Sequence, residues 1–504
     1  MSQRIAVLGG GPAGLYSALL LKDADRTRDV VVHERNPPDV TFGFGVVFSD
    51  PTLDRLLAKD PRAHADLLAR SERWNAIEVR LGGSVVRTDG QGFSAVSRRA
   101  LLAMLQARAR EAGVELRFQS EIQRLDELAG YDLVIAADGL NSLARGAYEE
   151  AFRPQIEAGA AKYIWFGTTR RFDALTFLFE ENEHGAFAVH AYPFAEGEST
   201  FLVECDEAAW RRAGLDRDDD PRVAQARSME YCKDVFARHL GDHELLANAS
   251  RWLNFRTVRA ARWWHENVVL LGDAAHTAHF SVGSGTKMAM EDALALRDAL
   301  DAHARLPDAL DAFEKERRAD VERLQASSGP SLAWWEHFGR TMYLSPEAFV
   351  FHFLTRNQKL TRASVRRRDP AFVEDVEGRF RSEHGLPSGA PASSAPLRTR
   401  SLRAPSRLLA EAPAGLRALP DDARTDGEIL AWGERARADG ADAVVVRAAS
   451  RGAPLVRALL ACDALRHGAR LAVVLDGGGL EPEEIETSIL ARRIDAYVAP
   501  PAAR

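Results

Sequence analysis

Apolar runs that end at glycine or acidic residues recur in the N-terminal part of the chain. The run from Ile5 to Leu8 is typical of a buried parallel strand, and a helical pattern follows it. Three further runs, "VVVHER", "YDLVIAAD" and "VVLLGD", have the same strand character. Strands that alternate with helices predict an α/β fold built on a parallel sheet.

Two later segments depart from this pattern. Between Thr168 and Cys205, three strand-like runs are separated by the polar turns "EENEHG" and "AEGES", which predicts an inserted β-sheet. A low-complexity linker, residues 386–397, precedes a tail in which helical and strand patterns alternate three times. We therefore expect a small C-terminal α/β domain over residues 398–504.

Composition excludes several classes of function. The 504 residues carry a net charge of −7, which argues against a nucleic-acid partner. Three cysteines lie far apart in the chain and suit a reducing, cytoplasmic compartment. No apolar run reaches the length of a membrane span, and the N-terminus lacks the pattern of a cleavable signal. We expect a cytoplasmic protein without nucleic-acid or membrane partners.

The first strand leads into G-x-G-x-x-G, formed by Gly9, Gly11 and Gly14. Gly9 permits a tight turn, Gly11 lets the backbone approach a pyrophosphate, and Gly14 lets the helix pack closely on the strand. Glu34 ends the next strand, where a carboxylate accepts a hydrogen bond from a ribose hydroxyl. This combination predicts a Rossmann-like dinucleotide site, and it fits NAD and FAD equally well.

Two later motifs separate these cofactors. "DGLNSLAR" starts at Asp138, and "VVLLGDAAH" contains Asp273 directly after a strand. With the glycine motif they resemble, in order, the three fingerprints of the FAD-dependent aromatic hydroxylases of group A. That family also has an arginine that contacts the FAD pyrophosphate, which Arg98 matches, and a mobile flavin loop, which "TFGFGVVFSD" matches.

The resemblance implies FAD as the bound cofactor, with Asp273 on its ribityl chain and a helix N-terminus at the flavin edge. No second G-x-G-x-x-G occurs, so NADH or NADPH would visit the flavin transiently. O2 would react with the reduced flavin to a C4a-hydroperoxide, which oxygenates an electron-rich ring. The expected cofactor-binding residues are Gly9, Gly11, Pro12, Ala13, Gly14, Glu34, Arg35, Gly45, Val46, Arg98, Asp138, Gly139, Gly272, Asp273, Gly283, Gly285, Thr286 and Lys287.

The segment "HFSVGSGTK" departs from the family pattern. His279, Phe280 and Ser281 stand where relatives usually have a proline, so we expect them to contact substrate. Lys287 replaces the usual asparagine; it could hold the anionic reduced flavin, meet an anionic group of the substrate, or point to solvent. His276 and His279 are spaced as two metal ligands on a helix, but no third ligand follows, and no metal is expected.

"GDAAHTAHFSVGSGTKMAMEDALAL" and "TFGFGVVFSD" resemble the salicylyl-CoA 5-hydroxylase and 2-aminobenzoyl-CoA monooxygenase branch, over roughly residues 1 to 380. The branch implies a ring acid carried as its CoA thioester. His190 and Tyr192 would share one face of a strand, where they could relay a proton from the ring substituent or simply be core residues. Arg366 and Arg367 belong to a basic cluster that could contact CoA phosphates or form a solvated face.

Parts of the tail resemble the first and last parts of an old-yellow-enzyme-like barrel. A closed eight-stranded barrel needs about 250 residues, so we expect a degenerate remnant without FMN; an unrelated α/β module is the alternative. The expected domains are an FAD-binding domain in two parts, residues 1–160 and 261–385 (the latter with a helical region), a substrate-binding sheet, residues 161–260, the linker and the tail. A homodimer is left open.

These observations predict an FAD-dependent, NAD(P)H-consuming monooxygenase that hydroxylates a CoA-linked ring acid of the salicylyl or 2-aminobenzoyl type. One alternative is oxygenation of a seven-membered-ring CoA thioester, with one or two oxygen atoms and loss of CoA, on a tropolone-type biosynthetic route. The other is a non-catalytic, flavin-binding interaction protein.

Overall fold

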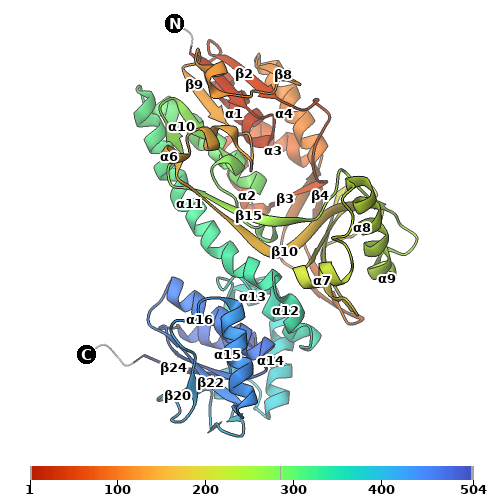
Figure 1. The fold of residues 1–504 in the computed structure, drawn as a ribbon, viewed down its shortest axis with the longest axis vertical. Helices are drawn as coiled ribbons and strands as arrows, with labels where there is room; N and C mark the ends of the chain where they lie inside the picture. The colour runs from red at the N-terminus through yellow and green to blue at the C-terminus, as the bar shows by residue number, and fades with distance from the viewer. Residues whose placement is uncertain (1–2, 284, 501–504) are drawn as a thin grey trace. The chain divides into compact units, whose positions relative to one another are not determined.

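The computed structural model describes residues 3–283 and 285–500. The chain divides into two compact units (Figure 1). The first unit contains the chain up to Ile77 and Gln91–Leu332, and the second contains Glu78–Gly90 and the chain from Ala333 onward. In the part of the chain that the structure describes, no helix combines the length and the apolar character that a membrane span requires.

A six-stranded sheet forms the centre of the first unit, with the strand order β16-β17-β9-β1-β2-β8. All neighbours are parallel except β16 and β17. The four apolar runs of the sequence supply its inner strands, and their side chains are buried on both faces, as in parallel sheets generally. Its strands are β1 (Arg4–Leu8), β2 (Asp29–Glu34), β8 (Glu115–Phe118), β9 (Leu133–Ala136), β16 (Trp264–His265) and β17 (Val268–Leu270).

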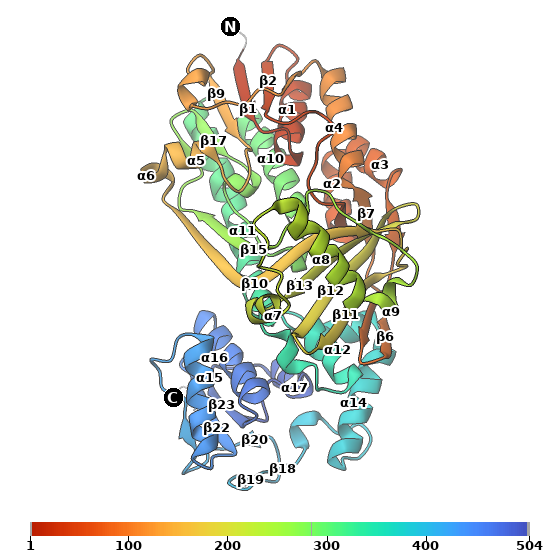
Figure 2. The same ribbon diagram turned by 45° about the vertical axis from the view of Figure 1, so that its right-hand side comes forward.

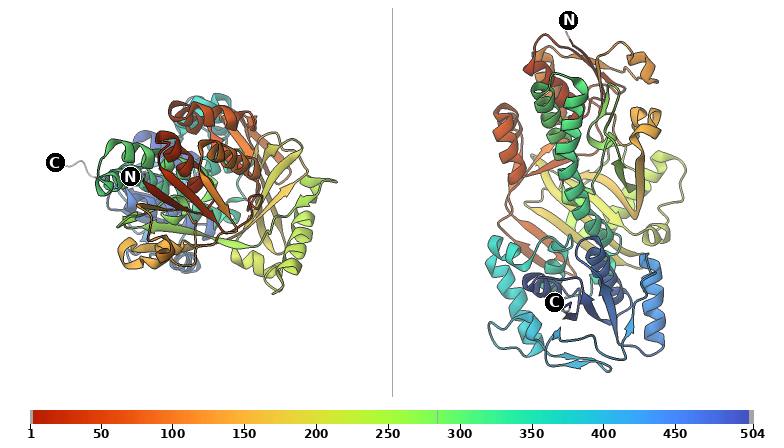
Figure 3. Two further views of the ribbon diagram at one scale, coloured as in Figure 1. Left: turned by 90° about the horizontal axis from the view of Figure 1, so that it is seen from above. Right: turned by 90° about the vertical axis from the view of Figure 1, so that its left-hand side faces the viewer.

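Helices cover this sheet, and α1 packs against both α4 and α10. Their bounds are α1 (Pro12–Ala24), α4 (Arg98–Ala112) and α10 (Gly285–Ala302). The long helix α11 (Leu306–Trp335) is continuous, as the right-hand view of Figure 3 shows. The other helices of this part are α2 (Asp50–Lys59), α3 (Pro61–Leu68), α5 (Leu143–Ala147) and α6 (Glu149–Phe152).

A second, antiparallel sheet carries the inserted part of the first unit. The three strands expected between Thr168 and Cys205 are present, joined by the long β10 and by β14 and β15, which the sequence pattern did not indicate. Helices α7, α8 and α9 pack on one face of this sheet (Figure 2). The bounds are β10 (Pro154–Thr168), β11 (Leu175–Asn182), β12 (Gly185–Ala195), β13 (Glu198–Cys205), β14 (Leu245–Leu246), β15 (Leu253–Ala260), α7 (Glu207–Arg212), α8 (Pro221–Val235) and α9 (Ala237–Leu240).

A small three-stranded sheet, in the order β3-β7-β4, completes the first unit. Its central strand leads directly into α4, so Arg98 stands at the point where strand becomes helix. The bounds are β3 (Gly45–Ser49), β4 (Glu72–Trp74) and β7 (Phe93–Ser97).

The second unit contains a five-stranded parallel sheet in the order β20-β24-β23-β22-β21, which confirms the predicted C-terminal α/β domain. The three helix–strand alternations expected in the tail are all present. Its elements are β5 (Ile77–Leu81), β6 (Ser84–Thr88), α12 (Pro346–Leu354), α13 (Arg362–Arg368), α14 (Pro370–His384), β18 (Leu397–Arg398), β19 (Arg403–Ala404), β20 (Leu408–Leu409), β21 (Arg417–Ala418), α15 (Asp426–Ala438), β22 (Ala443–Ala448), α16 (Ala453–Asp463), β23 (Ala472–Gly477), α17 (Pro482–Leu490) and β24 (Ala496–Val498).

The second unit is larger than the expected tail, because it also includes residues 333–385 and a hairpin from near the N-terminus. The expected linker, residues 386–397, is packed rather than free. Ala392 and Ser393 are buried, and their N–H groups donate to the carboxylate of Glu486. Small and polar residues here form a tight turn against α17, a use of such composition that sequence alone does not separate from a flexible linker.

A buried carboxylate connects three segments of the first unit. Asp292 on α10 is fully buried and accepts hydrogen bonds from the Gly272 N–H (3.1 Å), the His276 ring (2.9 Å) and Arg317 Nε (2.9 Å). Burial raises the pKa of Asp292, but His276 and Arg317 outweigh it, and the net pKa is about 2. The network therefore holds the turn after β17 against α10 and α11 with an ionised carboxylate.

We expect Asp292→Ala to lower the free energy of unfolding by about 3 kcal/mol, because it leaves a buried arginine without its principal partner. Asp298→Ala is the matched control on the same helix: Asp298 makes a partly exposed pair with Lys59 (2.9 Å), and its loss should cost less than about 1 kcal/mol. Urea unfolding curves of the two variants compare these effects. Equal losses in both would contradict a special role for the buried carboxylate.

Candidate active site

The turn after β1 and the start of α1 contain two glycines, Gly9 and Gly14, that no other residue could replace. Gly9 has φ +97° and its N–H donates to the His33 carbonyl at 2.8 Å. A Cβ atom would lie 2.4 Å from the Ala137 carbonyl at Gly9 and 2.0 Å from the Gly9 carbonyl at Gly14. At Gly11, by contrast, a Cβ atom would meet nothing within 4 Å. Gly9 and Gly14 are therefore required for packing within the protein, whereas Gly11 leaves the backbone open to a ligand.

Helix α1 begins at this open approach. No side chain caps its N-terminus, and Pro12 stands at its first turn, so the free N–H groups and the helix dipole favour an anionic group there. Ala13 is buried against the turn after β17. Glu34 accepts the Gly10 N–H at 2.6 Å through one oxygen and binds Asn36 through the other. The structure thus gives Glu34 a role in holding the glycine turn, beside the ribose contact that we predicted.

A cavity of about 260 Å³ lies over this turn. One buried oxygen in its wall, Asp138 Oδ1, has no hydrogen-bond partner, while Oδ2 accepts the Leu143 N–H at 2.7 Å. Burial raises the pKa of this carboxyl group. The cavity brings together most of the residues predicted for the dinucleotide end of the cofactor, namely Gly9, Gly11, Pro12, Glu34, Arg35, Arg98, Asp138 and Gly139.

Arg145 joins the second and third cofactor motifs. Its guanidinium donates to the Leu140 carbonyl (2.5 Å) and to the Ala274 carbonyl (2.8 Å). The N-cap of its short helix is Ser142, whose Oγ accepts the Arg145 N–H at 3.0 Å. The serine and arginine of the "DGLNSLAR" motif therefore position the loop that carries Asp273.

Asp273 is exposed, yet protein surrounds it closely enough for burial to raise the pKa of its carboxyl group. A carboxylate in this condition lines a hollow rather than a convex surface. Arg98 is the first charge that opposes this rise in pKa, and burial in turn lowers the pKa of Arg98. Gly272, at φ +57°, sits where a Cβ atom would come within 3.4 Å of both Ala13 and Ala289, so this turn packs tightly against α1 and α10.

The N-terminus of α10 is formed by Gly285, Thr286 and Lys287, and Gly283 precedes it in a left-handed conformation at φ +60°. Lys287 does not point freely into solvent. Its side chain is 18% exposed, and Nζ lies 3.5 Å from Glu291 Oε1, one turn along the same helix. Burial lowers the pKa of Lys287, and Glu291 opposes this shift.

The segment expected to be the flavin loop is attached to the antiparallel sheet. The Tyr192 hydroxyl donates to the Gly45 carbonyl at 3.0 Å, and the Gly45 N–H donates to Thr200 Oγ1 at 3.1 Å. A Cβ atom at Gly45 would lie within 2.9 Å of Phe194, Thr200 and Tyr192. Val46 is buried in the core of the first unit. Tyr192, predicted as a proton relay, is thus bonded to the loop, and burial raises its pKa to about 12.

His190 lies on the same strand, β12, and its Nε2 bonds Glu204 Oε2 on β13 at 2.6 Å. The second oxygen of Glu204 lies 3.5 Å from His279 Nε2, and His279 Nδ1 bonds Ser281 Oγ at 2.8 Å. Burial raises the pKa of Glu204, but the two histidines outweigh it and bring it to about 2. His190, predicted as catalytic, and His279, predicted to contact substrate, thus meet around one buried, ionised carboxylate.

Aromatic rings enclose this histidine–glutamate cluster. Phe280 packs edge-on against His190 (5.6 Å between ring centres) and against Tyr163 (4.9 Å). Phe255 packs edge-on against His279 at 5.0 Å. His276 instead bonds Asp292, so the two histidines of the "HTAH" segment face different carboxylates.

Arg366 and Arg367 lie on α13 in the second unit. Arg366 forms an ion pair with Glu377, and Arg367 donates to Ser364 Oγ at 3.2 Å. Arg362 shares Glu377 with Arg366 and also pairs with Glu483, whereas Arg367 is exposed. Contact of Arg366 and Arg367 with CoA phosphates stays a prediction.

Glu204, Thr200 and Tyr163 were not identified from the sequence. Glu204 could have been found, because it is a charged residue at the end of the apolar run "STFLVEC", and a carboxylate in a buried strand needs a partner. Its partner was not visible, since the contact of Glu204 with His279 depends on how the sheet meets a distant loop.

Comparisons with known proteins agree with this geometry. Residues 2–328 match the model of the FAD binding domain family. The chain is 48% identical over 410 residues to a salicyloyl-CoA 5-hydroxylase of Streptomyces sp, which covers 80% of this chain and 78% of that one. It is 37% identical over 333 residues to the 3-hydroxy-4-methyl-anthranilyl-[aryl-carrier protein] 5-monooxygenase of Streptosporangium sibiricum, covering 66% and 89%.

Solved structures show the same fold. 2-Methyl-3-hydroxypyridine-5-carboxylic acid oxygenase matches with a TM-score of 0.54 at 23% identity, covering 73% of this chain and 98% of that one. Aklavinone-11 hydroxylase, solved with FAD and aklavinone, matches with a TM-score of 0.51 at 20% identity, covering 69% and 72%. The fold is that of FAD-dependent aromatic monooxygenases. The chain belongs to the FAD binding domain family, and its similarity to salicyloyl-CoA 5-hydroxylase confirms the predicted branch.

The site fits FAD on three observations of its own: the uncapped N-terminus of α1, the open backbone at Gly11, and the unpartnered oxygen of Asp138. The glycine turn and α1 would hold the pyrophosphate, and Asp273 would hold the ribityl chain.

Gly11→Ala and Gly14→Ala should separate cofactor binding from folding. A methyl group at Gly11 meets no protein atom, so this variant should keep its midpoint of thermal unfolding without cofactor and lose FAD affinity about tenfold or more. A methyl group at Gly14 overlaps the Gly9 carbonyl, so this variant should unfold at lower temperature even without cofactor. Flavin fluorescence titration and apoprotein melting curves measure the two effects. An unchanged FAD affinity in Gly11→Ala would refute the pyrophosphate assignment.

Proposed function

We propose that this protein is an NAD(P)H-consuming monooxygenase that hydroxylates the ring of a CoA-thioester-linked aromatic acid of the salicylyl or 2-aminobenzoyl type. The observation that carries the proposal is the buried carboxylate of Glu204, which bonds His190 and faces His279 inside an aromatic enclosure. A ring that bears a hydroxyl or amino group is a better nucleophile once a base has taken its proton. A buried imidazole backed by a carboxylate is suited to that task.

The bound flavin would supply the activation of O2, and the side chains would do the rest. His190 would accept the proton from the ring substituent at Nδ1, while its Nε2–H donates to Glu204, whose low pKa keeps it ionised. Phe280, Tyr163 and Phe255 would exclude water and orient the ring.

Tyr192 supports the site in a different way. Its hydroxyl is committed to the Gly45 carbonyl, so we assign it to holding the loop beside the sheet rather than to proton transfer. Lys287 would place a positive charge at the start of α10, where the flavin edge or an anionic substrate group is expected. Its pair with Glu291 holds the ammonium in position, and the carboxylate opposes the fall in pKa that burial causes.

Two similarities support a tethered substrate. The names of the relatives from Streptomyces and Streptosporangium both describe a ring acid joined to a carrier, CoA in one case and an aryl-carrier protein in the other. The histidine–glutamate cluster lies within residues 2–328, which match the FAD binding domain family. The cluster would contact the ring and not the carrier, so it is compatible with any thioester that carries such a ring.

The second unit is consistent with a shortened barrel. Strands β21, β22, β23 and β24 follow one another in space as in the chain, with a helix between successive strands, and the first strand, β20, pairs with the last. First-to-last pairing is how a parallel barrel closes. We infer that this unit is a barrel remnant with five of the usual eight strands.

Oxidation of NADH or NADPH should be stimulated by salicylyl-CoA or 2-aminobenzoyl-CoA about tenfold or more over the free acids, because only the tethered acid is presented correctly. Steady-state absorbance of the nicotinamide measures the rate, and mass spectrometry under labelled O2 should show one added oxygen with CoA retained. Two added atoms, or free CoA, from a cycloheptatriene-CoA thioester would instead support the seven-membered-ring reaction. No stimulation by any thioester would refute a monooxygenase of this substrate class.

Glu204→Gln should lower the rate of hydroxylated product formation about a hundredfold, since the base loses its ionised partner. NAD(P)H oxidation should fall less, so that more of it becomes uncoupled from product. Glu181→Gln is the control, because Glu181 is an exposed glutamate on β11 of the same sheet. Product chromatography beside nicotinamide absorbance gives both rates. Full coupling in Glu204→Gln would contradict the role assigned to the cluster.

A further inference from the structure

Three side chains of the second unit converge at a buried point that the proposed function does not use. His352 on α12, Asp463 at the end of α16 and His467 in the next turn each bring one possible metal-ligand atom within 4.8 Å of the other two. His352 and His467 are buried, with at most 2% exposure, and Asp463 is 19% exposed. Two imidazoles and one carboxylate form a donor set typical of transition-metal sites.

Each of these side chains has a buried atom without a hydrogen-bond partner: His352 Nε2, Asp463 Oδ1 and His467 Nε2. Buried polar atoms are rarely left unpaired, because desolvation without a partner costs about 1–3 kcal/mol each. Three such atoms in one cluster point to a shared ligand that accepts all of them. A single water molecule has only two hydrogens to donate, whereas a metal ion can accept three lone pairs.

The outer contacts of the histidines agree with this interpretation. His352 Nδ1 lies 2.6 Å from the Ala491 carbonyl and must donate to it, which leaves a lone pair on Nε2. His467 Nδ1 lies 3.0 Å from the Tyr343 hydroxyl, and donation there frees its Nε2 in the same way. Metal-binding histidines typically donate their other ring N–H to a carbonyl or another oxygen.

The backbone between Asp463 and His467 is unusual. Residues Ala464–Gly468 form a turn of π-helix directly after α16, and such turns are found frequently at functional sites. The wider turn leaves His467 Nε2 3.9 Å from Asp463 Oδ1, so the two do not bond directly. A metal ion would draw them together by less than 1 Å, at the ligand distances usual for zinc.

The positive charges of Arg493 and Arg466 both act on Asp463. Arg493 Nε lies 3.5 Å from the other oxygen of Asp463, Oδ2. The rest of its guanidinium is engaged, because it donates to Thr355 Oγ1 (2.9 Å) and to the His352 carbonyl (2.8 Å). Arg493 therefore holds Asp463 through Oδ2 and leaves Oδ1 for a ligand. Its charge makes the site weaker than a site with an unopposed carboxylate.

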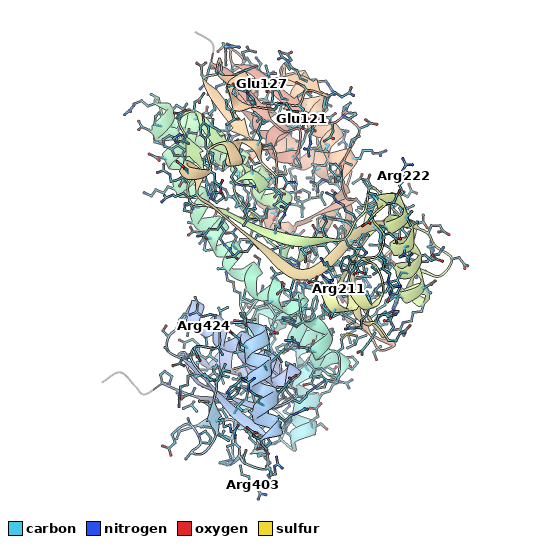
Figure 4. All side chains as sticks on the ribbon, in the orientation of Figure 1. Glu121, Glu127, Arg211, Arg222, Arg403 and Arg424 are labelled. Carbon is cyan, nitrogen blue, oxygen red and sulfur yellow. The ribbon has the colours of Figure 1, made fainter. Side chains whose placement is uncertain are left out.

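A cavity of about 800 Å³ in the second unit reaches the cluster. All three residues contribute to its wall, together with polar side chains such as His337, Asp426 and Arg424, the last of which is labelled in Figure 4. Structural zinc sites are closed by four protein ligands, whereas three ligands beside a cavity leave a position for water or a small molecule.

We propose that the second unit binds one divalent first-row transition-metal ion through His352 Nε2, Asp463 Oδ1 and His467 Nε2, with an open coordination position facing the cavity. The site is independent of the flavin and of the proposed monooxygenase reaction. It gives the second unit a ligand of its own in place of the FMN that so short a tail was not expected to bind, and it departs from our expectation that the chain holds no metal. That expectation considered only the histidines of the "HTAH" segment.

Equilibrium dialysis of the full-length, FAD-loaded protein against Zn²⁺, after treatment with a chelator, tests the proposal. The unaltered chain should retain about one zinc ion, and His352→Gln and His467→Gln should each reduce retention about tenfold. His384→Gln is the matched control in the same unit: His384 Nδ1 also bonds a carbonyl, that of Phe380, but its Nε2 is already occupied by Arg407. This variant should retain zinc like the unaltered chain.

Co²⁺ binding gives a second readout that needs no variant, since its visible absorption reports mixed nitrogen and oxygen ligands at a site with low coordination number. Circular dichroism and the flavin content show whether each variant is folded; if His352→Gln is not, Asp463→Asn takes its place. Zinc retention far below one ion by the unaltered chain would overturn the proposal. Equal retention by His467→Gln and by His384→Gln would overturn it too.

Discussion

The ionised carboxylate of Asp292 fixes the geometry on which the candidate flavin site depends. It receives the backbone of Gly272, the ring of His276 and the guanidinium of Arg317 in a fully buried position. Buried charges are tolerated only when they are paired and fully hydrogen-bonded. The turn after β17 therefore has little freedom, and Asp273, the next residue in the chain, is presented at a defined place beside Arg98. The histidine of this motif, His276, belongs to the same network.

A second connection joins the cofactor half of the first unit to its substrate sheet. Gly45 is bonded through both its backbone groups, to Tyr192 and to Thr200, and no side chain fits at that position. The loop that would cover the flavin is thus hydrogen-bonded to β12, the strand that carries His190. The buried hydroxyl of Tyr192 is committed to this contact and holds the loop against the strand.

Much of the fold could be predicted because its signals are local. The glycine turn, the strands that precede Asp138 and Asp273, and the helix–strand alternation of the tail each lie within one stretch of sequence, and the structure confirms them. The partners of His190, His279 and Lys287 could not be predicted in the same way. Each is fixed by a carboxylate whose approach depends on sheet register or helix pitch, and Glu204 comes from a strand 75 residues before His279. Packing of the segment 386–397 was likewise hidden, since its composition is that of a linker.

The order of strands in the second unit has a consequence for how the chain folds. Strand β20 pairs with β24, which ends at Val498, and the unit also contains Glu78–Gly90 from near the beginning of the chain. Asp89 of that early segment already donates its N–H to Asp369. These contacts join residues far apart in the sequence, and such long-range contacts slow folding because the chain between them must be ordered first. Loss of β24 would leave both β20 and β23 with an unpaired edge, and unpaired strand edges favour aggregation.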